Sequence, residues 1–275
     1  MDIVWVIVIT VLVLAVVGFV LGLLLGVAGN IFAVKKDVRV EQIVSVLPGA
    51  NCGGCGFAGC QNYADAVVKG QADPGRCSVG GAEVAKQVAA IMGVESGDSV
   101  RMRAEVACNG DCEKAKSKYA YKGLKDCVSV AKLGNGPKEC AYGCIGLGTC
   151  AAACPFGAIE LRNGIARVDA EKCRACGVCV SACPQHIIQL VPFDSRVAVL
   201  CSSKDKGAVL RKYCDAGCIA CGICAKNCPT GAITVQENVA RIDYSLCTNC
   251  GTCAEKCPRK VIRWVENVQE ESDRV

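Results

Sequence analysis

Residues 218–229 read CIACGICAKNCP, and residues 247–258 read CTNCGTCAEKCP. Each stretch places four cysteines with two, two and three residues between them, and a proline follows the fourth cysteine. Runs with this spacing bind pairs of [4Fe–4S] clusters, and the fourth cysteine of each run ligates the other cluster. The two runs therefore predict a dicluster module with crossed ligand sets, namely Cys218, Cys221, Cys224 and Cys257 for one cluster and Cys228, Cys247, Cys250 and Cys253 for the next.

The same arrangement occurs once more, 74 residues earlier in the chain. Residues 173–184 form a regular run, CRACGVCVSACP, whereas the run before it is more widely spaced over residues 140–155, CAYGCIGLGTCAAACP. The glycine-rich loop of the wider run is expected to change the surroundings of its cluster and hence its reduction potential. We expect the same crossed ligation as in the later repeat, with Cys140, Cys144, Cys150 and Cys183 on one cluster and Cys154, Cys173, Cys176 and Cys179 on the other.

Short alternating stretches lie between the cysteine runs of each repeat. They cover residues 158–161 with 165–168, and residues 232–235 with 239–242. The residues that separate them, Asn163-Gly164 and Glu237-Asn238, are typical of β-hairpin turns. Each repeat is therefore expected to be a ferredoxin module in which short strands cover two clusters.

Zinc is the alternative metal for cysteine-rich motifs. Structural zinc sites combine pairs of ligands, often including histidine. The chain has 25 cysteines and a single histidine, His186. Runs of four cysteines closed by proline, repeated four times with so little histidine, favour iron–sulfur clusters over zinc.

A fifth ligand set is expected nearer the N-terminus. A helix is predicted over residues 61–68, and the turn Asp73-Pro74-Gly75 after it brings the distant Cys77 back towards Cys52, Cys55 and Cys60. Residues 54–59 also match the pattern GxGxxG, but they lack the preceding apolar strand of a dinucleotide fingerprint, so no nucleotide site is predicted there. The expected ligands are three closely spaced cysteines and one distant cysteine, Cys52, Cys55, Cys60 and Cys77.

Five cysteines remain after these assignments: Cys108, Cys112, Cys127, Cys201 and Cys214. The first three are separated by three and fourteen residues, which suggests three ligands of a sixth cluster. Its fourth ligand would be Cys201 or Cys214, and the sequence leaves this choice open. The alternative is that some of the five are free buried thiols, since cysteine packs well in protein cores.

The N-terminus carries an apolar segment. No charged residue occurs between Asp2 and Lys35, and about 20 apolar residues suffice to span a bilayer. No basic residue precedes the segment, and it is too long for the apolar part of a signal peptide. Lys35 and Lys36 follow it, so the positive-inside rule predicts a single-pass protein with its C-terminal domains in the cytoplasm.

The formal net charge of +5 does not indicate a nucleic-acid-binding protein. A [4Fe–4S] core held by four thiolates adds a charge of about −2, so six of them would bring the total to about −7. A basic run is nevertheless present and could steer an acidic partner, with a solvated helix face as the alternative. It contains Lys114, Lys116, Lys118, Lys122 and Lys125.

Taken together, the N-terminal apolar helix, the segment LPGANCGGCG at residues 47–56 and the ferredoxin repeats resemble the B subunits of Rnf complexes, in their long anaerobe-type form. The resemblance implies a subunit of an ion-translocating ferredoxin:NAD+ oxidoreductase in the cytoplasmic membrane of a prokaryote. This subunit would accept electrons from soluble reduced ferredoxin and relay them to flavin and membrane subunits. It implies neither an independent catalytic site nor direct NAD binding on this chain.

The expected architecture is α+β. A transmembrane anchor precedes a small α-rich 4Fe-4S domain, and two tandem bacterial-type 2[4Fe-4S] ferredoxin modules follow. Residues 47–77 also resemble the cluster domain of corrinoid iron–sulfur proteins, so a corrinoid-protein activator or a redox sensor is the alternative function. The expected boundaries are 1–34 for the anchor, 35–95 for the 4Fe-4S domain, 96–135 for a cysteine-containing connection, 136–200 and 201–266 for the modules, and 267–275 for a polar tail.

Overall fold

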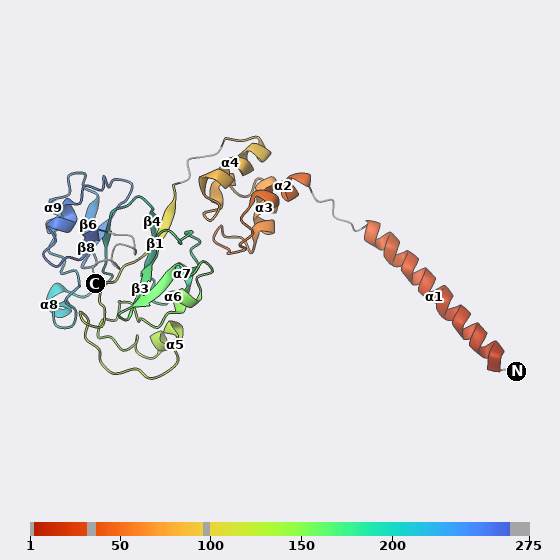
Figure 1. Cartoon of the computed structure of the whole chain (residues 1–275), viewed down its shortest axis with the longest axis horizontal. Coiled ribbons are helices and arrows are strands. Elements are labelled where there is room, and N and C mark those ends of the chain that lie inside the picture. The colour runs from red at the N-terminus through yellow and green to blue at the C-terminus, as the bar shows by residue number, and fades with distance from the viewer. Residues whose placement is uncertain (1–2, 32–36, 96–99, 265–275) are drawn as a thin grey trace.

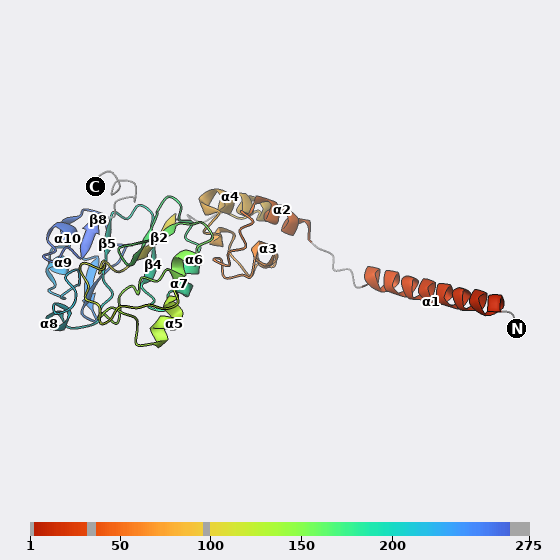
Figure 2. The ribbon, with the colours of Figure 1, turned by 60° about the horizontal axis from the view of Figure 1, so that its bottom comes forward.

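The computed structural model describes residues 3–31, 37–95 and 100–264. Helix α1 (Ile3–Ile31) lies apart from the other elements in both views (Figures 1 and 2). Its segment Ile7–Ala28 has a mean hydropathy of 3.1, and none of it is buried. Within the described ranges it is the one helix long and apolar enough to cross a membrane, as the sequence predicts. The flanking Lys35 and Lys36, on which the predicted orientation depends, lie outside the described residues.

Three helices and a short 3-10 turn form the first folded unit after α1. Buried aliphatic side chains from the helices pack around Tyr63, which is 1% exposed. The Tyr63 hydroxyl donates to the carbonyl oxygens of Asp73 (2.9 Å) and Pro74 (2.7 Å), and this ties the returning chain to the helix. The predicted helix and turn are both present. The elements are α2 (Val38–Val46), α3 (Cys60–Val68), η1 (Pro74–Arg76) and α4 (Gly81–Met92).

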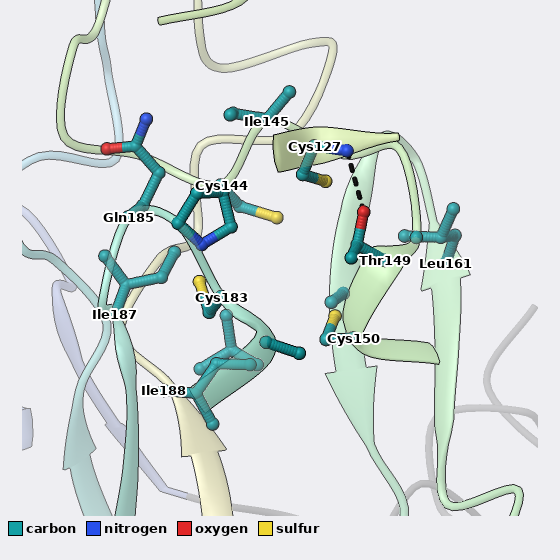
Figure 3. A pocket seen from close by; sticks show the side chains of 15 residues that line it. Cys127, Cys144, Ile145, Thr149, Cys150, Leu161, Cys183, Gln185, Ile187 and Ile188 are labelled. Carbon is teal, nitrogen blue, oxygen red and sulfur yellow. Dashed lines mark hydrogen bonds between the residues drawn. The ribbon is translucent and has the colours of Figure 1, made fainter. Parts of the chain in front are cut away.

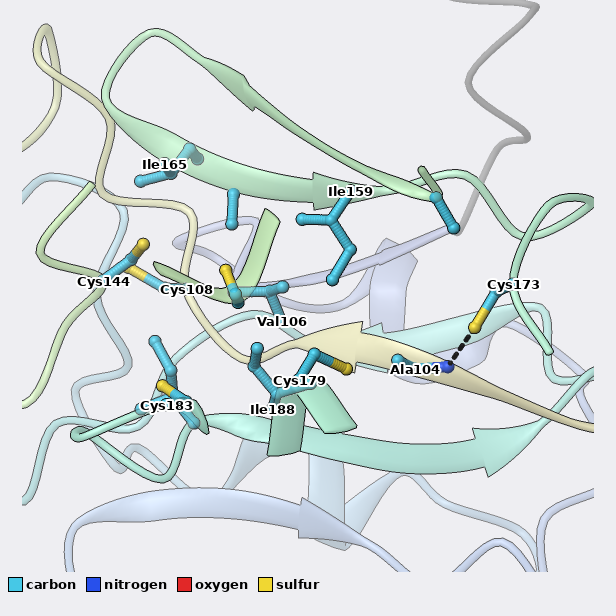
Figure 4. Packing of buried hydrophobic residues seen from close by; sticks show 14 residues of the cluster. Ala104, Val106, Cys108, Cys144, Ile159, Ile165, Cys173, Cys179, Cys183 and Ile188 are labelled. Carbon is cyan, nitrogen blue, oxygen red and sulfur yellow. Dashed lines mark hydrogen bonds between the residues drawn. The ribbon is translucent and has the colours of Figure 1, made fainter. Parts of the chain in front are cut away.

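The first ferredoxin module, module 1, contains two antiparallel strand pairs. The predicted hairpin is present and pairs β2 (Ile159–Arg162) with β3 (Ile165–Val168). The first and last strands, β1 (Met102–Val106) and β4 (Ile188–Pro192), form the second pair. Aliphatic side chains from these strands pack with six buried cysteines in one core (Figure 4). Because cysteines make up so much of this core, whatever they bind contributes to folding.

The second module, module 2, repeats this plan on a smaller scale. Its hairpin pairs β6 (Ile233–Gln236) with β7 (Val239–Ile242), again as predicted. Its terminal strands, β5 (Val197–Val199) and β8 (Ile262–Trp264), also pair with each other. Four one-turn helices carry the third cysteine of the four runs, and they are α6 (Thr149–Ala152), α7 (Val178–Ala182), α9 (Ile223–Lys226) and α10 (Thr252–Glu255). The two remaining helices are α5 (Cys127–Lys132) and α8 (Gly207–Leu210).

The expected connection over residues 96–135 is not separate from module 1. Strand β1 lies inside it, and its buried residues Ala104 and Val106 belong to the module 1 core. Hydrogen bonds to β4, more than eighty residues later, hold β1 there. The described part of the segment is thus the start of module 1 followed by a long insertion. Residues 113–126 of that insertion are not helical, so the basic run lies on a loop rather than on a helix face.

Candidate metal centres

Four cavities in the described structure are each lined by four cysteines. Their empty volumes are similar, about 350 to 380 Å³ with the open mouth included. We name them the N-terminal cavity (Cys52, Cys55, Cys60, Cys77), the α5 cavity (Cys127, Cys144, Cys150, Cys183), the bridging cavity (Cys108, Cys140, Cys201, Cys214) and the C-terminal cavity (Cys218, Cys221, Cys224, Cys257).

Two of these cavities bring together the cysteines that the sequence groups. The N-terminal cavity contains the expected set from residues 52 to 77. Its loop is fixed locally, because the Cys60 amide donates to Asn51 Oδ1 at 2.9 Å and Tyr63 anchors the turn before Cys77. The C-terminal cavity contains the first three cysteines of one run and the fourth cysteine of the next. This is the crossed arrangement expected for a ferredoxin module.

Two further groups of cysteines lie in the module cores. Cys154, Cys173, Cys176 and Cys179 are close enough for the first three to raise the pKa of the Cys179 thiol, which burial and these neighbours bring to about 11. Cys247 and Cys250 act in the same way on Cys253, whose pKa burial raises to about 11. Cys228 packs in the same core as Cys247 and Cys253. These contacts bring members of each expected set close together, and the module 2 core also contains Cys218, Cys224 and Cys257 of the other expected set.

The α5 cavity differs from the expected grouping. Cys127 takes the place expected for Cys140, beside Cys144, Cys150 and Cys183, and the four side chains face one space (Figure 3). Asp126 caps α5, and its carboxylate accepts hydrogen bonds from the Ser129 amide (2.8 Å) and from Thr149 Oγ1 (2.9 Å).

Thr149 also contacts Cys127 directly, because Thr149 Oγ1 accepts a hydrogen bond from the Cys127 amide at 2.7 Å. This link ties α5 to α6, which carries Cys150. The insertion therefore supplies Cys127 as the fourth thiol of the α5 cavity, in the place expected for Cys140.

The bridging cavity collects the cysteines that the sequence leaves unassigned, together with Cys140. The expected trio of Cys108, Cys112 and Cys127 is divided among three places. Cys108 follows β1 into the bridging cavity, Cys127 lies in the α5 cavity, and Cys112 is exposed and lines none of the four cavities. Cys201 and Cys214 both line the bridging cavity, where only one of them was expected.

The reason for this grouping is tertiary. Ser202 Oγ donates to the Tyr142 carbonyl oxygen at 2.8 Å and joins the Cys140 loop to the Cys201 loop. The cavity is thus built by both modules. One signal for it existed in the sequence, since the wide spacings between Cys140, Cys144 and Cys150 depart from a run that wraps a single cluster.

The donor chemistry fits [4Fe–4S] clusters. Backbone amides donate to cysteine sulfurs in both modules, from Ala104 to Cys173 (3.4 Å, Figure 4) and from Val261 to Cys257 (3.3 Å). Such bonds stabilise thiolate charge and tune cluster potentials. Arg259, which lines the C-terminal cavity, has a buried Nε with no hydrogen-bond partner in the described structure. A bound anionic group would supply that partner.

The cysteines surround a space rather than a point. In residues 3–31, 37–95 and 100–264, no three His, Cys, Asp or Glu side chains converge as they would on a single metal ion. Four thiols that line a cavity of about 350 to 380 Å³ leave room for a cluster, whereas a zinc ion requires four ligands at about 2.3 Å from one centre.

Burial disfavours the thiolate form of these cysteines. It raises the pKa of Cys150 to about 12, and the neighbouring Cys144, Cys183 and Cys127 contribute to this rise. Burial likewise raises the pKa of Cys201 to about 12. Cluster ligands must be deprotonated, so the positive charge of bound iron has to offset this cost. Binding of iron and folding of these cavities are therefore coupled.

Comparisons with known proteins agree with this chemistry. The family model FeS, described as an Fe-S cluster, matches residues 47–79. The model Fer4_7, described as a 4Fe-4S dicluster domain, matches residues 142–187 and 217–261. The chain therefore contains an iron–sulfur domain and two tandem dicluster domains.

Three relatives cover most of the chain. The B subunit of the Na(+)-translocating ferredoxin:NAD(+) oxidoreductase complex of Acetobacterium woodii is 46% identical over 86% of this chain and 71% of its own length. The chain belongs to this family of B subunits. The B subunit of the proton-translocating complex of Clostridium ljungdahlii is 46% identical over 86% of this chain and 84% of its own length. The B subunit of the ion-translocating oxidoreductase complex of Methanosarcina acetivorans is 42% identical over 86% of this chain and 90% of its own length.

This family also has members that match a smaller part of the chain. The B subunit of the ion-translocating oxidoreductase complex of Rhodobacter capsulatus is 44% identical over 32% of this chain and 48% of its own length. This relative matches about a third of the chain, whereas each of the three relatives above matches 86% of it.

Proposed function

We propose that this chain is the electron-transfer subunit of a membrane-bound ion-translocating ferredoxin:NAD+ oxidoreductase and that it holds six [4Fe–4S] clusters. The observation that carries the proposal is that sixteen cysteines line four cavities, four in each, and the cysteine spacing assigns eight more to two further sets. The ligands would be the four cavity sets named above together with Cys154, Cys173, Cys176 and Cys179, and with Cys228, Cys247, Cys250 and Cys253. When bound, each cluster supplies a one-electron carrier.

Contacts between neighbouring cysteine groups support a chain of six centres. The first step joins the N-terminal cavity to module 1. A Cβ built on Gly54 would lie 2.4 Å from the Cys176 carbonyl oxygen, so the two loops are in direct backbone contact. Electrostatic interaction between Cys52 and Cys176 supports the same proximity. Within module 1, Cys179 acts in the same way on Cys150 and so links the next two groups.

The bridging cavity continues the line into module 2. Cys108 interacts electrostatically with Cys144 of the α5 cavity, which lies on one side. On the other side the Cys218 amide donates to Cys201 Sγ at 3.4 Å, and this hydrogen bond leads to the C-terminal cavity. The last group shares the module 2 core with the C-terminal cavity. A cluster in the bridging cavity would therefore lie between the centres of the two modules.

The residues of this chain hold, order and shield these centres. Burial of ligands such as Cys144, Cys173 and Cys253 limits the access of water, amide donors offset thiolate charge, and α1 attaches the chain to the membrane. The proposed partners are soluble reduced ferredoxin and the flavin and membrane subunits, with neither direct NAD binding nor nucleic-acid binding. The proposed location is the cytoplasmic membrane of a prokaryote, with the folded domains in the cytoplasm. The names of the matched relatives favour this function over a corrinoid-protein activator or a redox sensor.

Iron analysis with EPR on the anaerobically purified chain tests the proposal. Six clusters predict about 24 irons per chain and reduced-cluster signals in redox titration. About 20 irons would refute the sixth site. Bound zinc, or absence of any reduced-cluster signal, would refute the main function.

A further inference from the structure

Lys138 is a buried cation at the bridging cavity. The residue is 6% exposed and lines the cavity beside Cys108, Cys140, Cys201 and Cys214. Its ammonium donates to the carbonyl oxygens of Gly110 (2.8 Å) and Gly164 (2.9 Å). A lysine ammonium has three donors, so two neutral carbonyls leave one unused.

No carboxylate of the described residues forms an ion pair with Lys138. Arg103 offers a contrast within the same module, because this 3% exposed side chain pairs with Glu105 at 2.8 Å. A buried charge is costly unless an opposite charge compensates it. The surroundings of Lys138 therefore call for an anion in the adjoining space.

The lysine is held where it faces that space. The backbone on either side is fixed to the insertion, since the Lys118 amide donates to Pro137 and the Glu139 amide donates to Lys116. Gly110, whose carbonyl the ammonium contacts, lies against the cavity itself. A Cβ built there would be 3.4 Å from Cys214 Sγ and 3.9 Å from Cys108 Sγ.

Two other charged groups act on this cavity. Asp205 disfavours the thiolate of Cys140, whereas Arg259 favours the thiolate of Cys214. Arg259 also lines the C-terminal cavity, and its guanidinium donates a hydrogen bond to the Cys214 carbonyl oxygen at 2.7 Å. Lys138 differs from both because it is buried and faces the side towards module 1, where it also favours the thiolate of Cys144.

We propose that Lys138 is the fixed counter-charge of the bridging cavity and raises the reduction potential of the cluster held there. The proposal rests on the proposed function, because it requires a cluster on Cys108, Cys140, Cys201 and Cys214. Reduction adds one electron from a neighbouring site and makes the cluster with its thiolates more negative. A nearby buried cation stabilises that reduced form more than the oxidised form. The electron would therefore favour the junction between the modules.

The test is an EPR-monitored redox titration of the full-length, cluster-loaded chain. Cys214→Ala first identifies the signal of the bridging cluster by removing it, together with about four irons. Lys138→Met should then lower the midpoint of that signal more than the midpoint of any other. The expected change is tenfold or more in the equilibrium constant for reduction, which is about 59 mV or more for one electron. Lys138→Arg should keep the midpoint near that of the wild type, because it preserves the charge.

A matched control comes from the same insertion. Lys118 is exposed and also donates to a backbone carbonyl, that of Gly134 at 3.0 Å, so Lys118→Met should shift no midpoint. Loss of the bridging cluster in Lys138→Met but not in Lys138→Arg would also support the counter-charge. An unchanged midpoint in Lys138→Met with iron retained would overturn the inference, as would equal loss of the cluster in both variants. If Cys214→Ala removes neither iron nor a signal, the proposed sixth site fails instead.

Discussion

Replacing Cys127 by alanine tests the ligand sets directly. Sequence spacing groups Cys127 with Cys108 and Cys112, whereas the structure brings it to Cys144, Cys150 and Cys183. Cys127 is 8% exposed and is held by the hydrogen bond from its amide to Thr149. Its loss would leave three thiols in a buried cavity, and burial there strongly disfavours the charged form without bound iron.

The size of the effect follows from the number of proposed clusters. One of six clusters should be lost, so iron should fall from about 24 to about 20 per chain, with about one sixth of the cluster absorbance. Hydrogen exchange should also accelerate in α5 and α6, since the cluster and the Thr149 contact hold these helices together. Iron analysis, EPR and hydrogen-exchange mass spectrometry on the anaerobic protein measure the three effects.

Cys112→Ala is the matched control. This cysteine lies in the same insertion but is exposed and lines none of the four cavities, so its removal should leave iron and EPR signals unchanged. The reasoning is refuted if Cys112→Ala loses four irons while Cys127→Ala keeps them. It is also refuted if Cys127→Ala abolishes the same signal as Cys214→Ala, because the two residues would then share a cluster.

Three further predictions concern exposure, contact and packing. In the native, cluster-loaded chain a thiol reagent should label one cysteine, Cys112, and a membrane-impermeant reagent should fail to label it in intact cells if the folded domains are cytoplasmic. Labelling of several native thiols would argue against six clusters. Gly54→Ala should loosen the contact with module 1, seen as faster hydrogen exchange in residues 174–178 with iron retained, because its Cβ would lie 2.4 Å from a carbonyl oxygen. Gly75→Ala, with open space around it, should change nothing there. Ile165→Ala should lower the opening free energy of the β2–β3 amides by about 2–5 kcal/mol, whereas the exposed Leu190→Ala should change it by less than about 0.5 kcal/mol. Equal effects of the two substitutions would contradict the assigned core.

Much of the local structure could be predicted from sequence. The two hairpins appear where alternating residues flank turn residues, since a strand buried on one face imposes a period of two. The N-terminal and C-terminal cavities also follow from spacing. Their ligands lie on short loops, or on two regular runs of one module, so the covalent chain brings them together.

The connections between distant segments could not be predicted in this way. Strand β1 pairs with β4 across the whole of module 1, and neither strand carries a sign of its partner. Cys127 enters the α5 cavity through the Asp126 and Thr149 hydrogen bonds. The lysine run similarly gives no local sign of whether it lies on a helix or on a loop.

The sequence by itself determined the chemistry of this protein. It indicates iron–sulfur clusters, a membrane anchor and tandem dicluster modules, because ligand type, spacing and apolar length are local properties of the chain. Only the tertiary structure decided which cysteines from distant segments line the same cavity. Cys108, Cys140, Cys201 and Cys214 come from segments that are far apart in the sequence, and the cavity that they line also contains the buried Lys138. Such contacts depend on packing between distant segments, and the order of residues along the chain does not reveal them.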